Sequence, residues 1–268
     1  MKIVFLGDII SKAGRRALHK YLPQIRSKCN PDFIIANGEN AAGGIGLTPD
    51  VAEELFIMGV DVLTSGNHIW KYKELYNYLD SKSDKVIRPL NYPNSEQFRV
   101  PGVGYTVVKR GEYEFIVVNI MGRTFVHTID CPFKAMDNLL SKFSLGNNRM
   151  ILVDFHAETT SEKEAMGWFL DGRVTAMFGT HTHVQTSDER ILHKGTAYIT
   201  DAGMCGPMDT VIGVDRDIII QRFITQLPVA FKFSDETNLG VNGACVEVDT
   251  MTGKAIKIER ILFRDDLN

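Results

Sequence analysis

Polar side chains of the kinds that bind metal ions stand directly after apolar runs at several places in the chain. They are carboxylate, amide and imidazole groups, without a thiolate among them. Such a mixture suits Mn, Fe, Zn and similar divalent ions better than a structural zinc cage. The candidate residues are Asp8, Glu39, Asn40, Asn67, His68, His156, His181 and His183.

This set is large enough for two metal ions. Two ions need about eight to twelve ligands, several of which come from water and substrate, and a carboxylate such as Glu39 can bridge both. Two ions about 3.5 to 4 Å apart would lower the pKa of a bridging water toward about 7, which provides a hydroxide nucleophile at neutral pH. The expected chemistry is hydrolysis, in which the ions also offset the charge that develops on the oxygens of the substrate.

Each candidate also has a structural interpretation. Asp8 could cap the following helix, and Asn67-His68 could be a turn with a satisfied histidine. A lone histidine after a strand, such as His156, is more often structural. His181 and His183 at a strand end would place both rings on one face, which favours ligation but also occurs by chance. It is the whole set, in this order, that favours a metal centre.

The elements that would position these residues alternate in the first half of the chain. A helix is expected from Ser11, as its N-cap, to about Asn30, and a second helix runs from Thr48, also an N-cap, through Met58. Buried strands are expected at 2–7, 33–36 and 61–64. Each strand is followed by one of the polar clusters. Since ligands bind outside the carboxyl ends of parallel strands, the clusters are expected to converge.

The residue pattern in the second half of the chain predicts a hairpin, further strands and two helices. The hairpin joins 105–109 to 114–120 through an Arg-Gly turn. A capping box formed by Ser161 and Glu164 starts a helix that ends near Gly172. Another helix covers about 216–225. The other expected strands are 150–155, 174–178, 197–199, 229–233, 244–248 and 256–262.

Short blocks of the sequence resemble the calcineurin-like metallophosphoesterases. The superfamily motifs are matched by Gly7-Asp8, Gly66-Asn67-His68 and Gly179-Thr180-His181-Thr182-His183. Further blocks resemble its bacterial YmdB-type subfamily, in that subfamily's order and spacing along the whole chain. These blocks are Asn37-Gly38-Glu39-Asn40, Asn119-Ile120-Met121-Gly122-Arg123, Asp130-Cys131-Pro132-Phe133, Asp154-Phe155-His156-Ala157-Glu158, 179–186 and Thr200-Asp201-Ala202-Gly203-Met204.

The resemblance implies a role for each candidate. The ligands of one ion would be Asp8, Glu39, Asn40 and His183. The ligands of the other would be Glu39, Asn67, His156 and His181, so that Glu39 bridges. His68 would stay off the metals, as the general acid beside the substrate. Ile10 stands where the wider superfamily has a histidine, and Asn40 is expected to replace its coordination. Iron or manganese is the first choice, with zinc or magnesium as alternatives.

The resemblance also implies the fold and the activity. The fold would be a four-layer αββα sandwich of two mixed β-sheets flanked by helices. The activity would be phosphodiester hydrolysis of cyclic nucleotides, 2',3'-cyclic and also 3',5'-cyclic. A phosphomonoesterase is the alternative among enzymes, and a metal-dependent nucleotide-binding regulator is the alternative outside them. His68 favours the enzyme because a sensor needs no proton donor. A substrate-facing role for Arg123 or His127 is a further hypothesis.

Composition limits the partners and the compartment. The 268 residues carry a formal net charge of −3, so stable nucleic-acid binding is not expected. No apolar run reaches the ~18 residues of a membrane-spanning helix, and the first residues do not form a secretory signal, which predicts a cytoplasmic protein without membrane contact. The four cysteines lack paired spacing, which predicts reduced, mostly buried thiols. One domain over residues 1–268 is expected, and a homo-oligomer is compatible with the resemblance.

Overall fold

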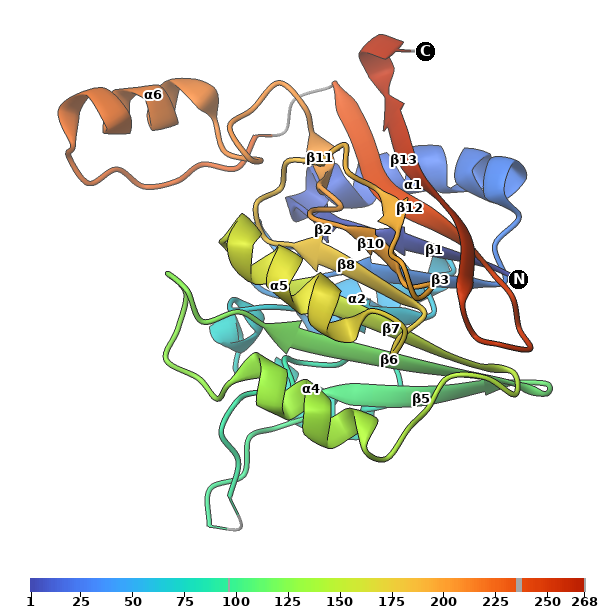
Figure 1. The fold of residues 1–268 in the computed structure, drawn as a ribbon. Helices are drawn as coiled ribbons and strands as arrows, with labels where there is room; N and C mark the ends of the chain where they lie inside the picture. The colour runs from blue at the N-terminus through green and yellow to red at the C-terminus, as the bar shows by residue number, and fades with distance from the viewer. Residues whose placement is uncertain (96, 235–237, 268) are drawn as a thin grey trace.

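The computed structural model describes residues 1–95, 97–234 and 238–267. Two β-sheets lie face to face, and helices cover the outer face of each sheet (Figure 1). Three apolar clusters fill the spaces between the resulting layers: one under the first helices, one between the sheets, and one under the later helices. The expected four-layer αββα sandwich of two mixed sheets is therefore confirmed.

The first sheet carries the N-terminal part of the candidate site. Its strand order is β2-β11-β12-β1-β3-β4, and β13 pairs with β12. β1, β3 and β4 are parallel, whereas β12 is antiparallel to its neighbours. The bounds are β1 Lys2–Leu6, β2 Asp8–Ile9, β3 Phe33–Asn37, β4 Val62–Thr64, β11 Met204–Pro207, β12 Leu239–Val248 and β13 Ala255–Arg264.

The second sheet has the order β5-β6-β7-β8-β10-β9. Its central strands β6, β7, β8 and β10 are parallel, and the expected β5–β6 hairpin forms one antiparallel edge. The bounds are β5 Tyr105–Arg110, β6 Tyr113–Met121, β7 Arg149–His156, β8 Ala176–Thr180, β9 Arg190–Ile191 and β10 Ala197–Ile199.

The first two helices on the first sheet begin close to the predicted residues, and the third was not predicted. They are α1 Ser11–Cys29, α2 Pro49–Ile57 and α3 Leu75–Ser81. Ser11 is the first residue of α1, and the N-cap position is Ile10, which makes no side-chain cap, so the predicted cap lies one residue off. The Ser11 Oγ accepts a hydrogen bond from the Ala13 backbone N–H (3.3 Å). Thr48 is the N-cap of α2, as predicted, and its side chain accepts a hydrogen bond from the Val51 N–H. A short 3-10 helix, Ile69–Lys71, follows the β4 cluster.

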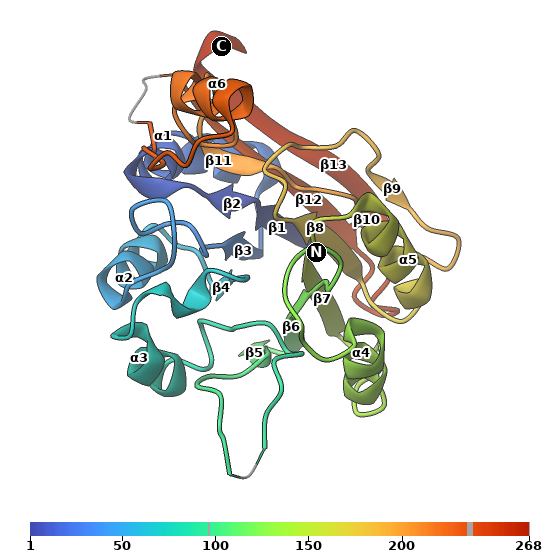
Figure 2. The same ribbon diagram turned by 90° about the vertical axis from the view of Figure 1, so that its left-hand side faces the viewer.

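The helices on the second sheet are α4 Pro132–Leu140 and α5 Thr160–Leu170. The predicted capping box is wrong, because α5 begins at Thr160 and places Ser161 inside its first turn, and its N-cap, Thr159, makes no side-chain cap. α6, Arg216–Thr225, is capped by Asp215 and projects from the body (Figures 1 and 2). A final 3-10 helix covers Asp265–Leu267.

The strand predicted at 229–233 is wrong. Of this segment, only Phe233 takes part in a bridge, an isolated one with Val214. The segment follows Pro228 and runs back beneath the projecting α6, where Phe231 keeps 44% of its surface exposed. Its apolar run therefore has no sheet face on which to be buried.

Candidate metal centre

The candidate residues converge at one edge of the sandwich, where β1, β3, β4, β7 and β8 end. This edge faces the viewer in Figure 2. Asp8 begins β2 directly after β1, and the other residues end their strand or follow within a few positions. The predicted convergence is thus present in the structure, and both sheets contribute to it. The residues that meet there are Asp8, Glu39, Asn40, Asn67, His68, His156, His181 and His183.

The tightest group of donor atoms surrounds His156 Nε2. This nitrogen lies 3.3 Å from Glu39 Oε1 and 3.1 Å from Asn67 Oδ1. His181 Nδ1 lies 3.0 Å from it. Ligand atoms that share one ion, each about 2.1 Å from it, lie about 3.0 to 3.4 Å apart in octahedral or tetrahedral arrangements. The spacing therefore fits a single divalent ion. Gly66 leaves room for this group, because a Cβ atom at position 66 would lie 2.3 Å from Glu39 Oε2.

The orientation of His156 is fixed from behind by Thr180 and Asp154. Thr180 Oγ1 donates its proton to Asp154 Oδ1 (2.6 Å), so it accepts from His156 Nδ1 (2.9 Å). Nδ1 therefore carries a hydrogen, and Nε2 is the nitrogen available to a metal. Asp154 is itself buried and accepts a further hydrogen bond from Asn37 Nδ2 (2.9 Å).

Replacing Thr180 with valine tests this support. The substitution keeps the shape but leaves His156 Nδ1 and Asp154 Oδ1 without their shared partner. We expect metal affinity to fall by about 10- to 100-fold, as for other partners of metal-binding histidines. Competition titration against a chelating dye measures the change. Thr106→Val, a buried threonine on β5, is the matched control, and an equal loss in both variants would contradict the assigned role.

The second group of donors, around Asp8, is looser. Asp8 Oδ1 lies 3.9 Å from His183 Nε2, and Asn40 Nδ2 lies 3.4 Å from the same nitrogen. Among the described residues no donor reaches the buried Asp8 Oδ1. A buried carboxylate oxygen without a hydrogen bond is a position for a cation or an ordered water. These residues fit a second ion. Asn40 turns its amide nitrogen to Glu39 Oε1 (2.9 Å) and its amide oxygen to His68. Ligation of the ion through the Asn40 oxygen therefore requires the amide to turn over.

In the metal-free site the candidate ligands favour a charged Glu39, a charged His156 and a neutral His181. Burial alone would raise the pKa of Glu39, but His156 and His68 hold it well below its usual range. Burial disfavours a charged His156, yet Glu39 and Asp8 raise its pKa to about 9. Burial and the neighbouring His156 lower the pKa of His181 to about 3. Metal binding would therefore release the Nε2 proton of His156.

The two histidines of the β8 motif reach the site from a turn. β8 ends at Thr180, and both His181 (φ 100°) and His183 (φ 65°) adopt left-handed backbone conformations. The expectation that a strand would align the two rings is therefore wrong. His181 faces His156, whereas His183 points its Nε2 toward Asp8 and donates through Nδ1–H to Ile212 O (2.9 Å).

A buried ion pair holds this turn. Asp201 Oδ2 accepts from Thr182 N (3.1 Å), from Thr182 Oγ1 (2.7 Å) and from Lys163 Nζ (2.6 Å). Lys163 on α5 is fully buried. Left-handed conformations cost non-glycine residues of order 1 to 3 kcal/mol and persist where the surroundings fix them. The Lys163–Asp201 pair supplies that constraint.

Lys163→Met should therefore destabilise the fold. The variant buries the Asp201 carboxylate without its cation, which costs about 3 to 5 kcal/mol in free energy of unfolding. Chemical denaturation measures this loss. The control, Lys109→Met, removes a lysine with 76% side-chain exposure and should change stability by less than about 0.5 kcal/mol. Similar values for the two variants would contradict the structural role of Lys163.

Sequence reasoning missed the supporting residues. Asp154 and Asp201 lie within the motif blocks, which was the available signal, and Asp154 also stands two residues before His156. Lys163 lies in none of the blocks. Glu158, also within a block, lies 2.9 Å from His181 Nε2. Arg123 and His127 line a separate pocket of about 350 Å³, whose lining includes no candidate ligand.

The family model described as YmdB-like protein matches residues 4–261. The chain belongs to the YmdB-like family. It is 47% identical to the 2',3'-cyclic-nucleotide 2'-phosphodiesterase of Bacillus subtilis, over 99% of this chain and 98% of that protein.

Among the described residues of this YmdB-like chain, no helix combines the length and the apolar character of a membrane span.

Solved structures show the same fold. A crystal structure titled as a novel phosphatase of Mycoplasma pneumoniae superposes with a TM-score of 0.92 at 39% identity, covering 98% of this chain and 93% of that one. The calcineurin-like phosphoesterase YfkN of Bacillus subtilis has a TM-score of 0.53 at 10% identity, covering 98% and 90%. The second likeness shows the fold alone, and it places the YmdB-like chain among calcineurin-like folds.

Proposed function

We propose that this YmdB-like protein is a metal-dependent phosphodiesterase that hydrolyses 2',3'-cyclic nucleotides. The observation that carries the proposal is the group of Glu39, His156 and His181, of which the first two are buried and His181 is half-buried, with ligand atoms within 4.8 Å of one another. The Bacillus subtilis relative, by its name, acts on 2',3'-cyclic nucleotides. The group supports the metal dependence, and the relative supports the substrate.

Two ions fit the donors present. The first would be held by Glu39, Asn67, His156 and His181, and the second by Asp8, Glu39, Asn40 and His183. Nitrogen and oxygen donors without thiolates suit iron or manganese. When bound, the ions would activate a water nucleophile and offset the charge on the phosphoryl oxygens.

His68 is the candidate general acid. Its side chain is 38% exposed, against 21% for His181, 11% for His183 and none for His156. Its Nδ1 lies 2.7 Å from Asn40 Oδ1, and its backbone N–H donates to Glu39 Oε2 (3.2 Å). Neither contact involves Nε2, which is available for proton transfer, and the backbone contact with Glu39 does not depend on the orientation of the Asn40 amide. The proton would go to the departing ribose 2'-oxygen, so the product would be the nucleoside 3'-phosphate.

The test uses purified protein loaded with manganese or iron, with metal content measured by mass spectrometry. Chromatography follows 2',3'-cyclic AMP, 3',5'-cyclic AMP and 3'-AMP as separate substrates. We expect conversion of the 2',3'-cyclic substrate to 3'-AMP, its loss on chelation and its return on adding metal. Turnover of 3'-AMP alone would instead establish a phosphomonoesterase. A protein that holds two ions and turns over none of the three would be a binding protein.

A further inference from the structure

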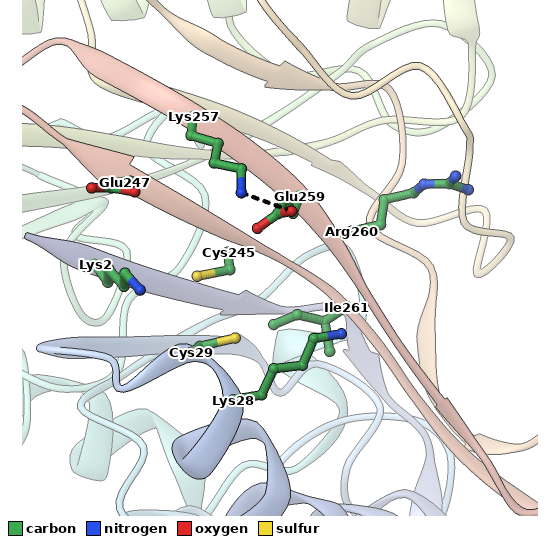
Figure 3. A pocket seen from close by; sticks show the side chains of 9 residues that line it. All are labelled: Lys2, Lys28, Cys29, Cys245, Glu247, Lys257, Glu259, Arg260 and Ile261. Carbon is green, nitrogen blue, oxygen red and sulfur yellow. Dashed lines mark ion pairs between the residues drawn. The ribbon is translucent and has the colours of Figure 1, made fainter. Parts of the chain in front are cut away.

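A second chemically distinctive place lies where α1 ends against β12 and β13. A pocket of about 180 Å³ opens there, and its lining includes two cysteines, Cys29 and Cys245 (Figure 3). None of the candidate metal ligands lines it. The pocket therefore needs an explanation of its own, separate from the proposed function.

The fold brings the two sulfur atoms together from distant parts of the chain. Cys29 is the last residue of α1, and Asn30 ends the helix in a left-handed conformation. Cys245 lies on β12, opposite Val4 of β1. Both cysteine side chains line this one pocket. In Figure 3 both sulfur atoms point into the same space between the helix end and the strand.

The surroundings make the two thiols unequal. The hydrogen bond from Cys245, assisted by Lys28 and Lys2, lowers the pKa of Cys29 to about 7. The same contact raises the pKa of Cys245 above its usual range. Glu259, which would oppose the thiolate, is paired with Lys257 at 2.9 Å. At neutral pH, Cys29 therefore carries substantial thiolate character beside a neutral thiol.

We propose that Cys29 and Cys245 form a peroxide-oxidisable pair that closes to a reversible disulfide. The Cys29 thiolate attacks hydrogen peroxide, breaks its O–O bond and becomes a sulfenic acid, releasing hydroxide. The Cys245 sulfur then attacks the Cys29 sulfur, and the sulfenic oxygen leaves as water with the Cys245 proton. Two electrons pass from the two sulfurs to the peroxide. A small dithiol restores both thiols.

The other two cysteines do not share this arrangement. Cys205 is fully buried, and burial raises its pKa to about 12. Cys131 is half-buried at the start of α4, and the pocket that it lines contains no other cysteine. Oxidation should therefore be confined to the Cys29–Cys245 pair. The bond would join the end of α1 to β12 and so restrict the unfolded chain.

The experiment treats the native protein with hydrogen peroxide, counts free thiols and maps disulfide-linked peptides by mass spectrometry. We expect wild type and Cys131→Ser to lose two thiols each, in one Cys29–Cys245 cross-link that dithiothreitol reverses. Cys29→Ser should lose none, and Cys245→Ser should stop at a sulfenic acid trapped by dimedone. The oxidised wild type should melt about 5 to 10 °C higher than the reduced protein.

Three results would overturn the proposal. They are a cross-link that includes Cys131 or Cys205, equal thiol loss in Cys29→Ser and wild type, and irreversible oxidation of Cys29 with Cys245 unmodified. Circular dichroism of each variant before treatment confirms that the compared proteins are folded. Since the readouts are thiol content and melting temperature, a failure of the proposed phosphodiesterase activity would not affect them.

Discussion

Glu39→Gln is expected to lower kcat/KM for 2',3'-cyclic AMP by about 10³-fold or more, because it removes the carboxylate proposed to serve both ions. The substitution keeps the size of the side chain and changes its charge. Glu39 is 1% exposed, and although burial opposes its charge, His156 and His68 lower its pKa and so keep it ionised. Even without metal, the variant should therefore melt lower than the wild type, because the cationic form of His156 loses its buried partner. Steady-state kinetics and thermal denaturation measure the two effects, and metal analysis on the same samples shows whether the ions are bound.

Glu114→Gln is the matched control for this variant. Glu114 lies at the start of β6, the opposite end of the strand from the candidate metal centre, in an ion pair with Arg149. Its replacement should change kcat/KM by less than about twofold. A Glu39→Gln protein that retains both its metal content and its activity would remove Glu39 from the proposed ligands.

His68→Gln is expected to lower kcat for 2',3'-cyclic AMP by about 10²- to 10⁴-fold, the usual contribution of a general acid. The ribose 2'-oxygen is a poor leaving group and needs a proton as the bond breaks. A 4-nitrophenyl phosphodiester has a leaving group that departs without one. The defect should therefore be much smaller with the nitrophenyl substrate, while metal content stays unchanged.

This leaving-group comparison distinguishes proton donation from other roles of His68. If the ring only shaped the site or assisted metal binding, both substrates would lose activity to the same extent. Equal losses would therefore reject the general acid and leave the rest of the proposed function intact. His193→Gln is a useful control, since His193 stacks on Trp168 (5.4 Å between ring centroids) away from the candidate ligands.

The elements that position the site were predictable because their signals are local. The run before Asp8 and the cap signals at Ser11 and Thr48 depend on neighbouring residues, and the structure has the strand and both helices where they were expected. β2, β9 and β11 span two to four residues, which is too short for a periodic pattern. α3 and α4 were also not predicted. One domain over residues 1–268 stays a prediction, supported by the inter-sheet cluster that contains both Ile3 and Ala255.

The site was predictable in its residue types and less so in its geometry. Residue types and order identified the candidates, and the strand ends explained why they would meet. The orientation of Asn40 and the left-handed turn of His181 and His183 depend on tertiary contacts. The buried pair Lys163–Asp201 joins residues 38 apart in sequence, and no local pattern predicts such a pairing.

The most direct test of the two-metal centre is an anomalous difference map from crystals of the protein loaded with manganese. We predict two peaks on either side of the Glu39 carboxylate, one among Asn67, His156 and His181 and the other beside Asp8 and His183. The Asn40 amide should then present its oxygen to the second peak. A single peak, or peaks elsewhere with this cluster free of metal, would contradict the account.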